Sequence, residues 1–125
     1  MNLNQVTIYS KFPVETVEFF EKLGLRRIVD SLPRYARLEC PDGESTLSVH
    51  IGENISSNNG ITLYFECEEL DEKVAELRAL GLSFDEEPTD REWFGREAYL
   101  SDPNNNKICL FYAGENRKNP PWRVK

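Results

Sequence analysis

An internal repeat constrains this sequence more than any other feature. Residues 21–25 (EKLGL) and 78–82 (RALGL) both close an amphipathic helical pattern, with Gly24 and Gly81 in equivalent positions. Further matches follow in the same order along the chain. Residues 5–10 correspond to 62–67, residues 38–41 to 100–103, and residues 52–53 to 114–115. Because an ordered series of matches indicates one unit used twice, the chain is expected to fold as two copies of a single module.

Each copy has the pattern of a strand, an amphipathic helix and three further strands. The first strands alternate apolar and polar residues over 5–10 and 62–67. Gly24 and Gly81 suit the left-handed position just past a helix end. The helix residues expected to face inward are Val17, Phe20, Leu23 and Leu25 in the first copy, and Leu70, Val74, Leu77 and Leu80 in the second. The later strands are expected at 25–31, 35–40, 45–51, 82–87, 96–101 and 107–113.

The sequence therefore predicts an α+β fold of two tandem βαβββ modules, each a four-stranded sheet with one helix on its outer face. Module one covers residues 4–52, a linker 53–59, module two 60–113, and a C-terminal tail 114–125. The length of 125 residues is that of one ordinary domain.

Composition excludes several classes of protein. A net charge of −7 argues against nucleic-acid binding, which needs basic residues to neutralise phosphates. The sequence has neither a signal peptide pattern nor an apolar run of membrane-spanning length, so a cytoplasmic protein is expected. Three cysteines, Cys40, Cys67 and Cys109, form no CxxC pair, which favours reduced, buried thiols over a disulfide framework.

The helix end EKLGL and the segment 95–115 (GREAYLSDPNNNKICLFYAGE) resemble the vicinal oxygen chelate superfamily. This superfamily includes glyoxalase I, extradiol dioxygenases, fosfomycin-resistance enzymes and bleomycin-binding proteins, and the resemblance covers about residues 4 to 113. It implies curved mixed sheets around a cleft, with metal ligands on the first and fourth strands of each module. Those positions hold Gln5, Ser48, Thr62 and Cys109, where the enzymes usually have His or Gln, Glu, His and Glu.

A mononuclear site of that kind needs at least three imidazole or carboxylate donors. The four positions do not supply them, and the sequence contains a single histidine. We therefore expect no metal site and no cofactor.

Strand alternation predicts which side chains line the cleft. Leu47, Val49 and Ile51 should face the first helix, and Ile108, Leu110 and Tyr112 the second. The residues left for ligand binding, together with those of the hairpin loop at 88–95, are Gln5, Tyr9, Ser48, His50, Thr62, Tyr64, Glu66, Trp93, Phe94, Cys109 and Phe111. A cleft with aromatic walls and a few polar groups is typical of a small-molecule site.

Several of these residues have two interpretations. His50 is a candidate base, or a half-exposed residue at a strand end. Glu66 is a second carboxylate or a counter-ion, or a solvated strand end. Cys109 is a nucleophile only if its pKa is depressed, and is otherwise an inert thiol. Trp93 and Phe94 cap the cleft, enter a partner subunit, or pack locally.

Flanking arginines, Arg91 and Arg96, are candidates for an anionic ligand or are solvent-facing. In the tail, Trp122 is expected to pack on its own domain or on a second subunit. A homodimer is expected because a two-module unit leaves sheet edges that are usually covered.

Two functions stay open at this point. The first is a metal-independent protein that binds a small aromatic or cationic molecule, as the bleomycin-binding branch does. The second is a lyase, isomerase or dioxygenase of the same superfamily. Such an enzyme would use a displaced metal site or metal-free acid–base chemistry with His50 and Glu66 as candidate catalytic residues.

Overall fold

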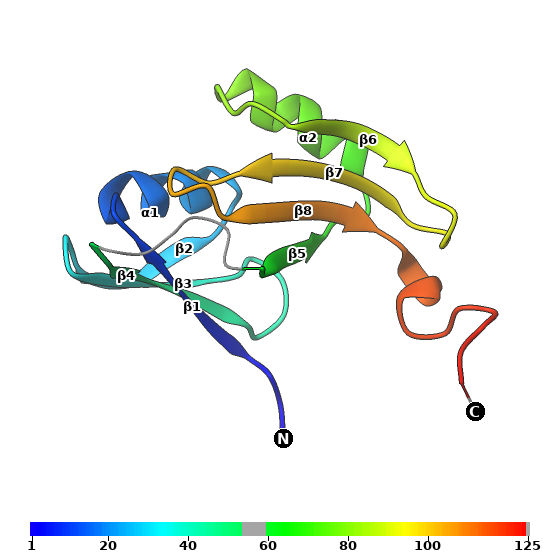
Figure 1. Ribbon diagram of the computed structural model, residues 1–125, viewed down its shortest axis with the longest axis horizontal. Helices are drawn as coiled ribbons and strands as arrows, with labels where there is room; N and C mark the ends of the chain where they lie inside the picture. Colours follow the sequence, from blue (N-terminus) through cyan, green and yellow to red (C-terminus); the bar gives the residue numbers. More distant parts are fainter. Residues whose placement is uncertain (54–59, 125) are drawn as a thin grey trace. The chain divides into compact units, whose positions relative to one another are not determined.

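The computed structural model describes residues 1–53 and 60–124. It contains two four-stranded sheets, each accompanied by one helix, which confirms the predicted α+β fold of two βαβββ modules (Figure 1). The chain divides into a first unit, Met1–Asn59 with Asp102–Asn105, and a second unit, Gly60–Ser101 with Asn106–Lys125. Apart from Glu53, the linker expected at 53–59 lies outside the described residues.

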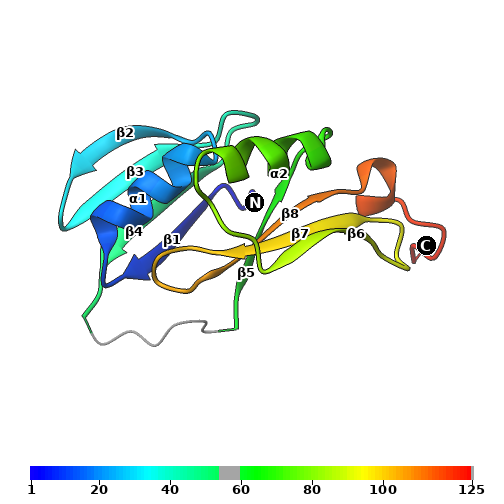
Figure 2. The same ribbon diagram turned by 90° about the horizontal axis from the view of Figure 1, so that it is seen from above.

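The first unit has the strand order β1-β4-β3-β2. Its elements are β1 (Gln5–Ser10), α1 (Pro13–Lys22), β2 (Arg26–Ser31), β3 (Tyr35–Glu39) and β4 (Thr46–Ile51). β1 and β4 are parallel, whereas β3 is antiparallel to both of its neighbours. Figure 2 shows α1 lying along one face of this sheet.

The second unit repeats this topology with the order β5-β8-β7-β6. Its elements are β5 (Thr62–Glu66), α2 (Leu70–Ala79), β6 (Glu86–Asp90), β7 (Arg96–Ser101), β8 (Lys107–Tyr112) and the short 3-10 helix η1 (Gly114–Arg117). The β5–β8 pair is parallel, and the other pairs are antiparallel.

The expected position of one strand, 82–87, was wrong, because β6 runs over Glu86–Asp90. β6 is one of the two edge strands of its sheet, it pairs with β7 on its inner side, and its register shifts between Glu86 and Thr89. An edge strand tolerates Pro88, which cannot donate to a ladder, whereas a central strand would not.

The helix ends that define the repeat have the predicted geometry. Gly24 and Gly81 have positive φ angles of 111° and 94°. Just beyond each glycine, a backbone amide bonds back into the helix, Leu25 N to the Phe20 oxygen and Leu82 N to that of Leu77, both at 3.1 Å. A left-handed glycine followed by such a bond is a common way to end a helix.

The cores form between each helix and the apolar face of its sheet. In the first unit the core includes Val17, Phe20, Leu38, Leu47 and Val49, and in the second Leu70, Val74, Leu77, Leu100 and Ile108. Burying such side chains stabilises a fold by about 1.5–3 kcal/mol each.

Two residues expected to face a helix are in fact exposed. Leu80 is 50% exposed because α2 ends at Ala79 and Leu80 is already its C-cap. Tyr112, at the end of β8, is 41% exposed and lies against Gly114, where an added Cβ would be 2.9 Å from the tyrosine hydroxyl. In the described ranges, none of the helices is both long enough and apolar enough to cross a membrane.

Candidate functional site

The sheet face opposite the helix carries polar and aromatic side chains in both units. In β1, Ile8 and Ser10 are buried on the helix side, where the Ser10 and Thr16 hydroxyls lie 2.8 Å apart. Tyr9 lies between them and points to the other face, where it is exposed. The alternation predicted from the sequence therefore holds in this strand.

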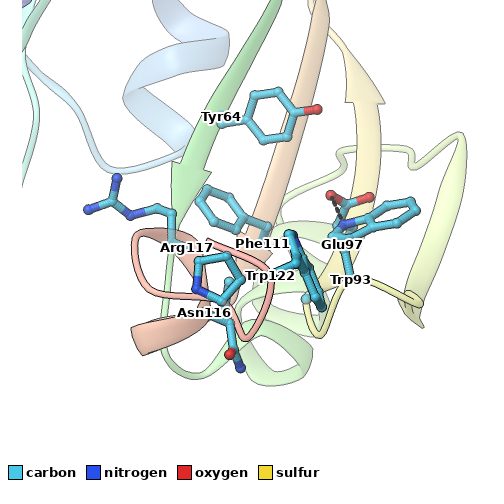
Figure 3. A pocket seen from close by; sticks show the side chains of 10 residues that line it. Tyr64, Trp93, Glu97, Phe111, Asn116, Arg117 and Trp122 are labelled. Atoms are coloured by element: carbon cyan, nitrogen blue, oxygen red, sulfur yellow. Dashed lines mark hydrogen bonds between the residues drawn. The ribbon is translucent and has the colours of Figure 1, made fainter. Parts of the chain in front are cut away.

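In the second unit this face contains a pocket of about 440 Å³. The strands contribute its floor and the C-terminal segment one of its walls, as Figure 3 shows for the labelled side chains. The lining residues are Tyr64, Trp93, Gly95, Glu97, Phe111, Ala113, Asn116, Arg117, Pro120 and Trp122. The volume is within the range of small-molecule sites.

Aromatic rings form most of the pocket wall. Tyr64 of β5 and Phe111 of β8 meet edge to face, with ring centroids 5.6 Å apart. Trp93 and Trp122 are 52% and 55% exposed, although exposing an indole to water is costly. These rings offer a planar ligand faces and edges to pack against.

Glu97 of β7 is the ionisable residue buried in this wall. Only 5% of it is exposed. Its Oε1 accepts hydrogen bonds from Arg91 Nε at 3.2 Å and from the Tyr99 hydroxyl at 3.1 Å. Its Oε2 accepts a long bond of 3.4 Å from Trp93 Nε1 (Figure 3). Oε2 is therefore the oxygen with the greater remaining capacity to accept a bond from a ligand.

Sequence reasoning missed Glu97, although a signal for it was present. Ala98 and Leu100 are buried on the helix side of β7, so strand alternation places Glu97 and Tyr99 on the opposite face. In the sheet register Glu97 pairs with Phe111, which was a predicted site residue. Applying the alternation to β7 as well as β8 would have found it.

The C-terminal segment holds the hairpin turn between β6 and β7. The ring of Trp122 packs on Phe94, with centroids 5.4 Å apart. Phe94 itself adopts a positive φ of 65° within the turn. Trp93 therefore lines the pocket, whereas Phe94 does not line it and supports Trp122 instead. Packing of Trp122 on its own domain was among the sequence expectations.

Glu66, a predicted ligand-binding carboxylate, has other partners. Its Oε2 accepts hydrogen bonds of 2.9 Å from the backbone amides of both Ala113 and Gly114. Its Oε1 lies 3.4 Å from Arg117 Nε. The carboxylate therefore fixes the point where the chain leaves β8, and its charge is partly neutralised.

Cys109 lies in the centre of β8 and is completely buried. Burial, reinforced by the negative charge of Glu97, raises the pKa of its thiol to about 12. A thiol with so high a pKa holds its proton at neutral pH, so the geometry favours the inert-thiol interpretation. Cys40 and Cys67 are half-buried.

The other predicted site residues do not line the pocket. Thr62 is a half-buried residue of β5 in the second unit. In the first unit, the Gln5 side chain accepts a bond from the Thr46 hydroxyl at 3.0 Å. Ser48 pairs with the Tyr35 hydroxyl at 2.7 Å, and the Tyr9 ring lies 5.3 Å from that of His50. Of the predicted residues, Tyr64, Trp93 and Phe111 are the ones brought together.

The arginines that flank the hairpin turn are engaged by carboxylates. Arg91 pairs with Glu86 as well as with Glu97. Arg96 pairs with Asp71 at 2.9 Å and with Asp90 at 3.0 Å. Neither guanidinium group is therefore available to an anionic ligand without breaking an ion pair.

The residues present do not suit the metal that the resemblance implies. Within the described ranges, no three His, Cys, Asp or Glu side chains gather as metal ligands would. Of the four equivalent positions, Gln5 and Ser48 are engaged by neighbouring hydroxyls, and Thr62 offers only a hydroxyl. Mononuclear catalytic sites need three protein donors of suitable type, and this set does not supply them.

Comparison with protein families gives one match. A family model described as the Glyoxalase/Bleomycin resistance protein/Dioxygenase superfamily matches residues 2–110. No curated protein matches the sequence. The family match agrees with the resemblance that the sequence motifs indicated.

Solved structures with this fold include three bacterial proteins. A glyoxalase/bleomycin resistance protein/dioxygenase from Nocardioides aligns with a TM-score of 0.79 and 21% identity, covering 100% of this chain and 90% of its own. Lactoylglutathione lyase from Agrobacterium tumefaciens aligns with a TM-score of 0.73 and 16% identity, covering 89% and 92%. A glyoxalase/bleomycin resistance protein/dioxygenase family enzyme from Burkholderia phytofirmans PsJN gives 0.73 and 20%, covering 90% and 99%. At these identities the structures show a shared fold.

Proposed function

Since the chain belongs to the glyoxalase/bleomycin resistance protein/dioxygenase superfamily, we propose that it is a metal-independent binding protein that holds a planar aromatic molecule with a cationic or N–H donor group. The observation that carries the proposal is the aromatic pocket of the second unit with Glu97 buried in its wall.

The aromatic part of the ligand is inferred from the rings that line the pocket. Tyr64, Trp93, Phe111 and Trp122 are contributed by two strands, a hairpin turn and the C-terminal segment. A planar ligand between them would cover indole surface that is now in water. Aromatic contacts of this kind contribute about 0.5–1.5 kcal/mol each beyond the area they bury.

The donor group of the ligand is inferred from the chemistry of Glu97. Among the described residues, its Oε2 is held only by the 3.4 Å bond from Trp93 Nε1, so it can accept a shorter bond from an ammonium or a ring N–H. Bonds to a charged acceptor are about twice as strong as neutral ones. Arg117 also lines the pocket, but its positive charge is paired with Glu66. It should therefore repel a bound cation only weakly.

The alternative enzyme, with His50 and Glu66 as an acid–base pair, has less support. Both oxygens of Glu66 are occupied by the backbone of Ala113 and Gly114 and by Arg117. A general base must reach the proton it removes, and this carboxylate would first have to release three partners.

A matched set of naphthalene probes tests the proposal. 1-Naphthylmethylammonium, 1-naphthylmethanol and 1-naphthoate share one ring system and differ in charge, and binding can be followed by tryptophan fluorescence and calorimetry. The expected order of affinity is ammonium, then alcohol, then carboxylate. Trp93→Ala should weaken the ammonium at least about tenfold, which corresponds to about 1.4 kcal/mol.

Two further variants complete the test. Phe12→Ala removes an exposed aromatic ring from the first unit, outside the pocket lining, and should leave affinity unchanged. Glu97→Gln should weaken the ammonium more than the alcohol, because it removes the charge and keeps the shape. Equal affinity for all three probes, or indifference to Trp93→Ala, would contradict the proposal.

A further inference from the structure

The first unit carries a second cluster of side chains that the pocket does not use. On the face of the sheet away from α1, Tyr35 and Arg37 of β3 lie beside Ser48 and His50 of β4. Arg37 Nε donates to the Tyr35 hydroxyl at 3.0 Å, and this hydroxyl is 2.7 Å from that of Ser48. We propose that this cluster binds an oxyanion, the carboxylate or phosphate group of a small molecule.

The guanidinium group of Arg37 is charged and has no acidic partner among residues 1–53 and 60–124. Besides the Nε bond, the guanidinium carbon of Arg37 lies 5.8 Å from the centre of the Tyr35 ring. Glu39 lies on the same strand face, but it pairs with Arg26 at 2.6 Å. Arg37 is also half-buried, so its charge is less solvated than that of an exposed arginine such as Arg34.

The hydrogen-bonding capacity that this cluster leaves unused consists mainly of donors, without a charged acceptor. Arg37 can only donate, so the Tyr35 oxygen accepts its Nε proton. The Tyr35 and Ser48 hydroxyls have two protons between them and share one hydrogen bond. Whichever of them donates, one hydroxyl proton remains without a partner in the described part of the chain. Together with the two Nη groups of Arg37, this leaves three donor groups on neighbouring residues of β3 and β4.

The position of the cluster makes these donors costly to leave unpaired. Ser48 is completely buried, and Tyr35 and Arg37 are half-buried. The hydrogen bond with the Ser48 hydroxyl, and after it the Arg37 guanidinium, lower the pKa of Tyr35, as expected where negative charge is favoured. With Nε occupied, the Nη pair forms the flat fork that carboxylate and phosphate oxygens match.

His50 contributes an aromatic wall to the cluster, and its one ring N–H in the neutral form is already used. Its Nδ1 lies 2.7 Å from the carbonyl oxygen of Ile51, which can only accept, so Nδ1 carries the proton. Its ring lies 5.3 Å from that of Tyr9 and 6.2 Å from that of Tyr35. The three rings form a row across β1, β4 and β3 next to the donors, which suits the organic part of an anionic molecule.

Titration of the full-length, ¹⁵N-labelled protein with inorganic phosphate and with acetate, followed by NMR, tests the site. We expect saturable shifts of the Arg37 Nε–H signal and of the β3 and β4 amides around it, with one or both anions. Saturation by phosphate alone identifies a phosphate site, and saturation by acetate a carboxylate site. Either result supports the proposal.

Matched substitutions localise the effect. Arg37→Met should weaken binding at least about tenfold, while Arg34→Met, which removes the same charge from an exposed turn residue of this unit, should leave it unchanged. Tyr35→Phe should weaken it severalfold and move the Arg37 Nε–H signal before any anion is added, because Tyr35 positions that group. The dispersion of the amide signals reports whether each variant is folded. If Arg37→Met is not folded, Arg37→Lys takes its place, because lysine lacks the flat fork of the guanidinium group.

The proposal is overturned if shifts grow linearly with anion concentration without saturating, or if Arg34→Met weakens binding as much as Arg37→Met does. Because the cluster and the aromatic pocket share no residue, either result would leave the naphthalene experiment unaffected.

Discussion

Replacing Glu97 by alanine should destabilise the protein far more than replacing an exposed acidic residue would. The side chain of Glu97 is only 7% exposed, and its carboxylate receives bonds from Arg91, Tyr99 and Trp93. In Glu97→Ala these donors lose this acceptor, and Arg91 keeps its ion pair with Glu86. The half-buried Tyr99 hydroxyl would also lose one of its hydrogen-bond partners.

The magnitude follows from what is left behind. Removing one partner of a buried pair typically costs about 3–5 kcal/mol, but Arg91 is 21% exposed and retains Glu86, so we expect about 2–4 kcal/mol. Glu97→Gln keeps an acceptor oxygen in place and should cost about 1 kcal/mol. Glu86→Ala removes the other partner of Arg91, but that side chain is 48% exposed, so the cost should be below about 1 kcal/mol.

Urea unfolding at pH 7, followed by tryptophan fluorescence and circular dichroism, measures these differences. With a denaturant dependence of about 2 kcal/mol per molar urea, the middle of the usual range for small proteins, Glu97→Ala should lower the midpoint by about 1–2 M. Equal midpoints for Glu97→Ala and Glu86→Ala, or a Glu97→Ala variant that unfolds like the unmodified protein, would contradict a structural role of this carboxylate.

Four further outcomes are expected. Leu77→Ala, at a fully buried position, should cost about 2–5 kcal/mol in urea unfolding, whereas Leu80→Ala, at a position 50% exposed, should cost less than about 1 kcal/mol. Iodoacetamide labelling followed by mass spectrometry at pH 8 should modify Cys109 more slowly than Cys40 or Cys67, because its thiolate forms only near pH 12; equal rates would contradict the burial argument. Elemental analysis of protein purified without added metal should find less than one Zn, Fe, Ni or Mn per chain. Light scattering at micromolar concentration should give the mass of a dimer, and a monomer insensitive to dilution would refute this.

The fold could be predicted because the sequence contains the pattern of the βαβββ module twice. Gly24 and Gly81 need a left-handed conformation, which few other residues tolerate, so each marked a helix end without reference to the rest of the chain. β6 could not be placed in the same way. Its sequence, EEPTD, has no apolar alternation, since an edge strand buries little and is positioned by pairing with β7.

Part of the candidate site was predictable, either from a single strand or, for Trp93, from a large aromatic residue in a hairpin loop. Tyr64 and Phe111 follow from the alternation of β5 and β8, and both line the pocket. Glu66 has the same alternation, but its role depends on two backbone amides that arrive after β8, which periodicity does not reveal. Trp122 lines the pocket because the tail folds back onto Phe94, a contact that no local pattern encodes.

The attachment of the tail through Glu66 has a consequence for how such a protein can diversify. The bonds from Ala113 and Gly114 to this carboxylate use backbone amides, so they do not depend on which side chains follow. Residues 116–122, which complete the pocket wall, can therefore change by mutation while the point where the chain turns stays the same. Natural selection could alter what this protein recognises at a segment outside the duplicated modules, without disturbing the sheets that give it stability.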